Sequence, residues 1–261
     1  MSGSSVLKQE GVDELGYILT VGHQPIQPAF QVLVADVLSA LSSQFENLIH
    51  SIYLYGSVAR GDAAVSRSDL DLTLVLLRAA APDESKQLES IRSALQAAHP
   101  EVVKIDFDIG ILADVTAADS VNSWGFWLKH HCRCLWGNDL ATGFDPFKPS
   151  KAIALAVNRD LHDAMDSYAK RIETASNRTE IQLLKRAAAR KLIRATNILR
   201  SDDDLSWPQS LDNYADSFLR LYPAMADSIN YFLSAASGAH DISDDFVMRL
   251  RSFTNWLRMQ H

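Results

Sequence analysis

The order of apolar and polar positions along the first half of the chain predicts alternating helices and strands. Apolar residues at three- and four-residue intervals indicate helices, whereas short continuous or alternating apolar runs indicate strands. A helix and then a short strand are expected within 120–136. Together the elements predict a small mixed sheet with helices on one side. Before residue 120 we expect helices over 29–45 and 82–98, and strands over 49–55, 70–77 and 102–112.

The pattern changes after the segment 137–149, which holds Gly143, Pro146 and Pro149. Glycine and proline commonly separate structural units, so we expect a domain boundary there. No strand pattern follows, and the sequence predicts an α/β (α+β) domain over 1–145, with a loosely attached lead-in over 1–24, and an all-α helical-bundle domain over 150–261. Within the second domain we expect helices over 151–175, 179–200, 210–234 and 243–260.

Composition and charge narrow the class of protein. The 261 residues have 47% hydrophobic and 22% charged content, which is typical of a globular protein. The net charge is −7, and acidic residues outnumber basic ones only in residues 1–150. An acidic chain argues against general nucleic-acid binding through a basic surface. We therefore expect a carboxylate-rich site in the first half.

Targeting signals and cysteines bear on where the protein is located and on whether it binds zinc. No apolar run approaches the roughly 18 residues that span a bilayer, and the N-terminus lacks the pattern of a secretory signal. The two cysteines are too few for a disulfide framework, so we expect a cytoplasmic protein with no membrane partner. The run His130-His131-Cys132-Arg133-Cys134 does not have the ligand spacing of a zinc site, and we expect none there.

The segment between the first two expected strands carries the chemistry. Strand 49–55 runs into Gly56-Ser57, and strand 70–77 opens with Asp69-Leu70-Asp71. Side chains two residues apart on a strand share a face, so Asp69 and Asp71 point to one place. Two adjacent carboxylates repel each other and favour a hard divalent cation between them. Gly56 allows a phosphate to approach the backbone, and Ser57 offers its oxygens a hydroxyl and an N–H.

A third carboxylate is expected from strand 102–112. Asp106 and Asp108 share one of its faces with Lys104 and Gly110, and either aspartate could complete the site. Three carboxylates can hold two Mg²⁺ ions, of which one activates an attacking hydroxyl and the other neutralises charge on a triphosphate. The residues alone leave the choice between Asp106 and Asp108 open.

These motifs resemble those of the DNA polymerase β-like nucleotidyltransferase superfamily, in which a Gly-Ser signature precedes an Asp-x-Asp and a third acidic residue on a later strand. The resemblance covers roughly residues 50–112 and is greatest to the bacterial aminoglycoside and minimal nucleotidyltransferases. It implies that Asp69 and Asp71 hold both metal ions. It also implies that Asp106 helps to hold the ion that activates the acceptor, with Asp108 as the alternative third carboxylate or a general base.

The resemblance further implies an enzyme that transfers a nucleoside monophosphate, with AMP from ATP favoured, to an acceptor hydroxyl. A cationic small molecule of the aminoglycoside kind suits an acidic site as the acceptor. Two alternatives stay open: a minimal nucleotidyltransferase that modifies protein or RNA, as in toxin–antitoxin systems, and a non-catalytic nucleotide-binding protein. The sequence does not predict an oligomeric state.

Contacts to the nucleotide are expected from five residues: Gly56, Ser57, Arg60, Arg67 and Lys185. Arg60 and Arg67 flank the loop between the first two strands, and Lys185 belongs to a basic helical segment over 181–200. Like charges one turn apart repel, which favours a nearby anion. The alternative is a solvated face whose charges pair with acids such as those at 202–204. The acids considered for acceptor binding are Asp160, Asp163, Asp166 and Glu173.

Overall fold

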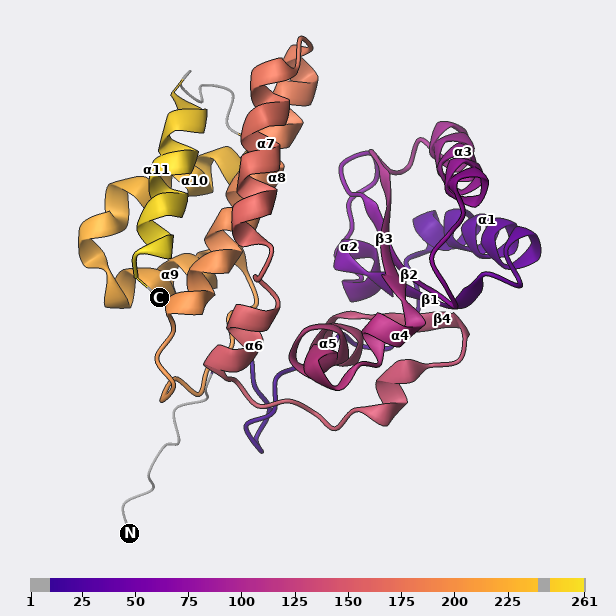
Figure 1. Ribbon diagram of the computed structural model, residues 1–261, viewed down its shortest axis with the longest axis horizontal. Coiled ribbons are helices and arrows are strands. Elements are labelled where there is room, and N and C mark those ends of the chain that lie inside the picture. The colour runs from indigo at the N-terminus through magenta and orange to yellow at the C-terminus, as the bar shows by residue number, and fades with distance from the viewer. Residues whose placement is uncertain (1–9, 239–244, 261) are drawn as a thin grey trace. The chain divides into compact units, whose positions relative to one another are not determined.

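A computed structural model describes residues 10–238 and 245–260 of the chain, which is shown in Figure 1. The chain divides into two compact units. One is Leu19–Phe147, and the other combines Met1–Ile18 with Lys148–His261. The expected lead-in therefore differs from the structure in part, because its residues 10–18 belong to the unit that also contains the C-terminal helices. Its first nine residues lie outside the described part of the chain.

The unit Leu19–Phe147 contains a four-stranded mixed sheet. Strand order is β3-β2-β1-β4, with β1 antiparallel to both neighbours and β2 parallel to β3. Its main elements follow the predicted order closely, with two short helices, one after β1 and one after β3, that were not predicted. They are α1 Pro28–Gln44, β1 Ile49–Tyr55, α2 Gly56–Arg60, β2 Leu70–Leu76, α3 Pro82–Ala98, β3 Ile105–Ile111, α4 Leu112–Val115, α5 Phe126–His131 and β4 Arg133–Gly137.

Helices cover both faces of this sheet, so the prediction of helices on one side is wrong. On one face, Leu41 of α1 and Leu88 of α3 belong to the same apolar core as Leu72 of β2. On the other face, a second cluster joins Tyr53 and Val75 to residues of α4 and α5. Neighbouring residues of a strand point to opposite faces, so Tyr53 and Val75 require their own cover.

The other unit is helical. The two long segments expected over 151–175 and 210–234 are each divided, the latter where Pro223 follows Tyr222 and disfavours a continuous helix. Residues 10–18 join this unit through a hydrogen bond from the Trp207 N–H to the Glu10 carbonyl. Its α-helices are α6 Lys151–Ala156, α7 Leu161–Thr174, α8 Arg178–Ala195, α9 Leu211–Leu221, α10 Ala226–Ser237 and α11 Phe246–Arg258.

The core of the helical unit forms where several helices meet. Ala188 and Leu192 of α8 are fully buried with Phe232 of α10 and Phe253 of α11. The architecture is thus an α/β domain with a mixed sheet and a helical region after it, as predicted. Among the described residues, no helix has the length and apolar character needed to cross a membrane.

Candidate active site

Three carboxylates converge at one end of the sheet. Asp69 directly precedes β2, Asp71 lies in β2, and Asp106 lies opposite Asp71 on β3. One carboxylate oxygen of each residue lies within 4.8 Å of those of the other two. The two-residue period of β2 and the parallel register with β3 together produce this arrangement. In residues 10–238 and 245–260, no other group of three acidic, histidine or cysteine side chains is as close.

Asp108 lies outside this group. It is two residues further along β3, opposite Thr73, and its side chain is exposed. The structure therefore brings Asp106 to the aspartate pair, and the roles of Asp106 and Asp108 remain predictions.

The face that bears the carboxylates is bordered by α5. Trp127 donates a hydrogen bond from Nε1 to the Thr73 hydroxyl at 3.2 Å. Its ring also meets the Tyr55 ring edge-on, with the centroids 4.9 Å apart. Because Thr73 and Asp71 point to the same face of β2, this contact covers the sheet next to the half-buried Asp71. Sequence reasoning missed Tyr55, whose signal was its place as the last residue of β1, before Gly56.

The carboxylates stand in an electrostatically unfavourable environment. Burial, followed by the charges of Asp69 and Asp106, raises the pKa of Asp71 to about 6, while Lys104 and Arg60 oppose the shift. Burial and the neighbouring carboxylates also raise the pKa of the Tyr55 hydroxyl far above its usual value. The site thus lacks positive charge, and a hard divalent ion with oxygen ligands fits this donor set.

Lys104 provides part of the missing charge. Its ammonium forms an ion pair with Asp106, with Nζ 2.5 Å from Oδ2, and both side chains are partly exposed. Lys104 and Asp106 are two residues apart and so point to the same face. The alternation of strand 102–112 predicts that Lys104 shares this face, but nothing local in the sequence shows which of the two aspartates it pairs with.

Gly56 lies directly against the carboxylate of Asp71. Its φ is +74°, and a Cβ atom built at this position would lie 2.1 Å from Asp71 Oδ2. The following residues form the short helix α2, in which the Ser57 carbonyl accepts the N–H of Asp62. The expected Gly-Ser turn is therefore a strand-to-helix junction, and glycine is required because a side chain would displace Asp71.

The remaining residues expected to contact a nucleotide are dispersed. Arg60 is exposed and pairs with Asp62 at 3.2 Å. Arg67 lies in the loop before β2, where its N–H donates to the Ala64 carbonyl. Lys185 belongs to α8 in the helical unit, with Nζ 5.6 Å from the centre of the Phe246 ring.

Two of the acids considered for the acceptor take part in ion pairs. Asp160 pairs with Lys191 of α8 at 2.8 Å. Glu173 forms two hydrogen bonds with the guanidinium of Arg251. Part of the basic charge of α8 is thus balanced by Asp160, which directly precedes α7. At the end of the basic segment, the charges of Asp204 and Asp202 oppose the lowering of the Arg200 pKa by burial.

The histidine and cysteine run has structural roles. His130 is buried and accepts the Phe147 N–H through Nε2 at 3.0 Å. Cys132 is buried against Thr73, and burial raises the pKa of its thiol well above the usual value. Both residues pack the region between α5 and β4.

Alanine in place of Gly56 is expected to lower the free energy of unfolding by more than the roughly 1–2 kcal/mol that a positive φ costs an L-residue. The excess arises because the new Cβ overlaps the Asp71 carboxylate. Gly61→Ala is the matched control, since Gly61 has φ +78° in the same unit and its nearest outside atom is 3.4 Å from a built Cβ. Urea unfolding of both variants tests this, and equal losses would contradict a tight approach to Asp71.

The metal-free protein is expected to lose stability as the pH rises from about 4 to about 7. The pKa of Asp71 is higher in the folded state, about 6 against 3.8, so its stabilising contribution is complete below pH 3.8 and is lost through pH 6. Asp71→Asn removes this dependence and should be more stable than the parent at pH 7.5 by about 2 kcal/mol. Urea unfolding in a chelator measures it. Asp83→Asn, at an exposed position of α3, should not change the profile.

Comparisons with known proteins agree with this geometry. Residues 34–106 match the nucleotidyltransferase domain family. No curated protein matches the chain by sequence. Among solved structures, the chain is similar to spectinomycin adenyltransferase AAD(9) from Enterococcus faecialis, solved with ATP and spectinomycin. The TM-score is 0.53 at 13% identity, over 87% of this chain and 98% of that one.

At this identity the structural likeness shows the fold, and the family match shows the type of domain. Both agree with the resemblance stated from the Gly-Ser and Asp-x-Asp motifs. The chain therefore carries a nucleotidyltransferase domain at residues 34–106 and shares its fold with that adenyltransferase, which supports a nucleotidyltransferase resembling the aminoglycoside enzymes.

Proposed function

We propose that the protein transfers AMP from ATP to a hydroxyl of a cationic small molecule of the aminoglycoside class, with Mg²⁺ as the cofactor. The observation that carries this proposal is the convergence of Asp69, Asp71 and Asp106 within 4.8 Å. It lies in a domain whose family match ends at residue 106. The solved adenyltransferase of the same fold, which holds ATP and spectinomycin, supports the choice of nucleotide and acceptor class.

The three carboxylates would hold the metal ions. Asp69 and Asp71 are assigned to both ions and Asp106 to the ion near the acceptor, as the family resemblance implies. When bound, Mg²⁺ neutralises charge on the triphosphate and lowers the pKa of the acceptor hydroxyl. The raised pKa of Asp71 supports the assignment, because the site in its metal-free form is short of positive charge.

Other residues of the domain would bind and orient the nucleotide. Gly56 allows the main chain to pass beside Asp71, and the Ser57 hydroxyl and N–H are assigned to phosphate oxygens. Arg60 and Arg67 are assigned to the charge of the triphosphate, whereas Lys185 belongs to the helical unit and stays an expectation from the sequence. Asp108 stands on the face of β3 that bears Asp106 and is the candidate to take the proton of the acceptor hydroxyl.

The acceptor is assigned from charge. The excess of acidic residues lies in the first half of the chain, so a cationic acceptor is attracted to the domain that carries the site. RNA, which is strongly anionic, would be repelled by the same charge. A protein acceptor stays the alternative that the experiment must separate from a small molecule.

Incubation with Mg²⁺, each labelled nucleoside triphosphate and a panel of aminoglycosides, spectinomycin, RNA and proteins tests the proposal. We expect label from ATP on a small molecule, with release of pyrophosphate. Asp69→Asn and Asp71→Asn should lower kcat about 10³-fold, since metal stabilisation of a transition state contributes several kcal/mol. Asp83→Asn on α3 is the control and should keep full activity. Label on RNA or protein alone would show that the acceptor class is wrong, and full activity of Asp71→Asn would reject the metal assignment.

A direct comparison of Asp106→Asn and Asp108→Asn separates the two candidate third carboxylates. Asp106→Asn is expected to weaken Mn²⁺ binding, measured by electron paramagnetic resonance without nucleotide. Asp108→Asn should bind Mn²⁺ as the parent does and change the pH profile of kcat instead, since it is assigned to proton transfer. The opposite pattern would exchange the two roles.

A further inference from the structure

The strand that carries Asp106 lies at an edge of the sheet. In the order β3-β2-β1-β4, β3 has a strand partner on one side only. The Lys104 carbonyl accepts the Leu70 N–H at 2.8 Å and therefore points towards β2. Main-chain N–H and C=O groups alternate in direction along a strand, so those of Asp106 also point towards β2. Ile105, between them, directs its main chain away from the sheet, where no strand completes the pairing.

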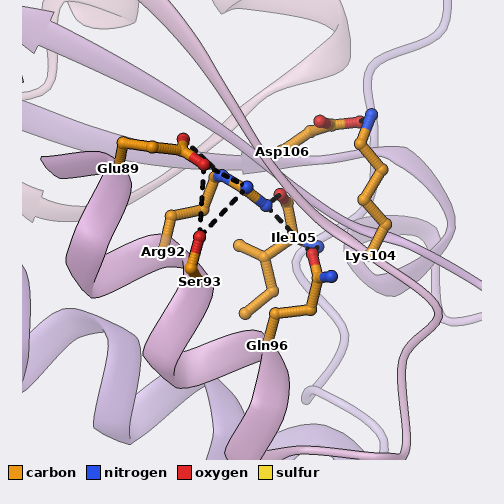
Figure 2. Close-up of polar contacts among 7 residues, drawn as sticks. All are labelled: Glu89, Arg92, Ser93, Gln96, Lys104, Ile105 and Asp106. Carbon is orange, nitrogen blue, oxygen red and sulfur yellow. Dashed lines mark hydrogen bonds and ion pairs between the residues drawn. The ribbon is translucent and has the colours of Figure 1, made fainter. Parts of the chain in front are cut away.

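Two side chains of α3 take the place of the missing strand at Ile105. Gln96 Oε1 accepts the Ile105 N–H at 3.1 Å. Arg92 Nη1 donates to the Ile105 carbonyl at 3.0 Å and to Gln96 Oε1 at 2.9 Å. Figure 2 shows Arg92 and Gln96 reaching from the helix to Ile105, with Asp106 and Lys104 beside it. Both main-chain groups of Ile105 are thus satisfied from one helix.

Arg92 is itself held in place. Its Nε donates to Glu89 at 2.8 Å and its Nη2 to the other oxygen of Glu89 at 2.5 Å. The Ser93 hydroxyl also donates to Glu89 at 3.2 Å, which fixes the carboxylate. The Arg92 side chain is 21% exposed. A planar guanidinium with this set of partners has little rotational freedom, so its contact with Ile105 is stiff.

We infer that Arg92 and Gln96 are positioning residues that fix Asp106 for nucleotide transfer. The inference rests on the proposed function. Ile105 directly precedes Asp106, whose carboxylate must meet Asp71 on the neighbouring strand. A shift of about 1 Å in a reacting group can lower a rate about a hundredfold, and an edge strand held by one ladder is free to make such shifts. The hydrogen bonds from Arg92 and Gln96 to Ile105, here called the clamp, remove that freedom at the residue next to Asp106.

The same helix offers a matched control. At its N-terminal end, Arg78 forms a two-point bridge with Glu84, and Glu84 also accepts the Ala81 N–H. This bridge joins Arg78, which lies before α3, to Glu84 of α3, and its contacts stay with residues 78–84. A merely structural role predicts similar effects from both bridges, whereas a positioning role predicts effects on the carboxylate site from Arg92 alone.

The test compares Gln96→Met, Gln96→Glu, Arg92→Lys and Arg78→Lys. Gln96→Met removes the acceptor for the Ile105 N–H at similar volume, and Gln96→Glu restores an oxygen there. Lysine at 92 cannot contact Glu89, Gln96 and Ile105 together. We measure the Mn²⁺ dissociation constant without nucleotide, kcat and the KM for ATP, hydrogen exchange of the Leu70 N–H, and thermal unfolding.

Gln96→Met and Arg92→Lys are expected to weaken Mn²⁺ binding and lower kcat about tenfold, as loss of outer-shell partners does. The KM for ATP should be unchanged, and the Leu70 N–H, which bonds to Lys104, should exchange faster. Gln96→Glu should recover the parent values, and Arg78→Lys should change thermal unfolding only.

Parent-like Mn²⁺ binding by Gln96→Met and by Arg92→Lys would overturn the inference, as would equal losses in Arg78→Lys. The Mn²⁺ comparison does not depend on an acceptor. If the parent protein binds Mn²⁺ but transfers no nucleotide, the proposed function is rejected. The Mn²⁺ affinities of the variants would still show whether the clamp positions Asp106. A parent that binds no Mn²⁺ would overturn both.

Discussion

Mutual repulsion of three half-buried aspartates is the constraint on which the rest of this domain depends. Asp69, Asp71 and Asp106 would separate if their side chains were free, and burial together with the charges of the other two raises the pKa of Asp71. The neighbouring Leu70 and Leu72 of β2 are buried at 0% and 1% exposure on the opposite face. Burial of a leucine contributes about 1.5–3 kcal/mol, so the apolar core fixes the strand and the carboxylates with it.

The features set by neighbouring residues could be predicted from sequence. The strand Ile49–Tyr55 has its predicted bounds, and Asp69 and Asp71 share a face because the period of a strand is local. Asp106 and Asp108 also share a face, so the same rule could not choose between them. The choice depends on the register of β3 against β2, which joins distant parts of the chain and places Asp106 opposite Asp71.

The faces of the sheet that the helices cover could not be predicted from sequence either, because they too depend on contacts between distant parts of the chain. The segment 120–136 was predicted as a helix and a strand, yet nothing in its own pattern shows that α5 covers the face of Tyr53 and Val75. Trp127 belongs both to this packing and to the border of the site, through Thr73 and Tyr55. Trp127 thus both packs against the sheet and borders the carboxylate site, and a sequence pattern cannot separate these two roles.

An edge position for the third carboxylate has a second consequence. An edge strand offers unpaired main-chain groups to strands of other chains, and proteins counter this with charged side chains or a covering helix. Here α3 covers β3 at Ile105, and the charges of Arg92 and Glu89 lie along that edge while Lys104 lies at its start. The contacts that hold Asp106 in place thus also oppose addition of a further strand, so one helix serves both the geometry of the site and the closure of the sheet.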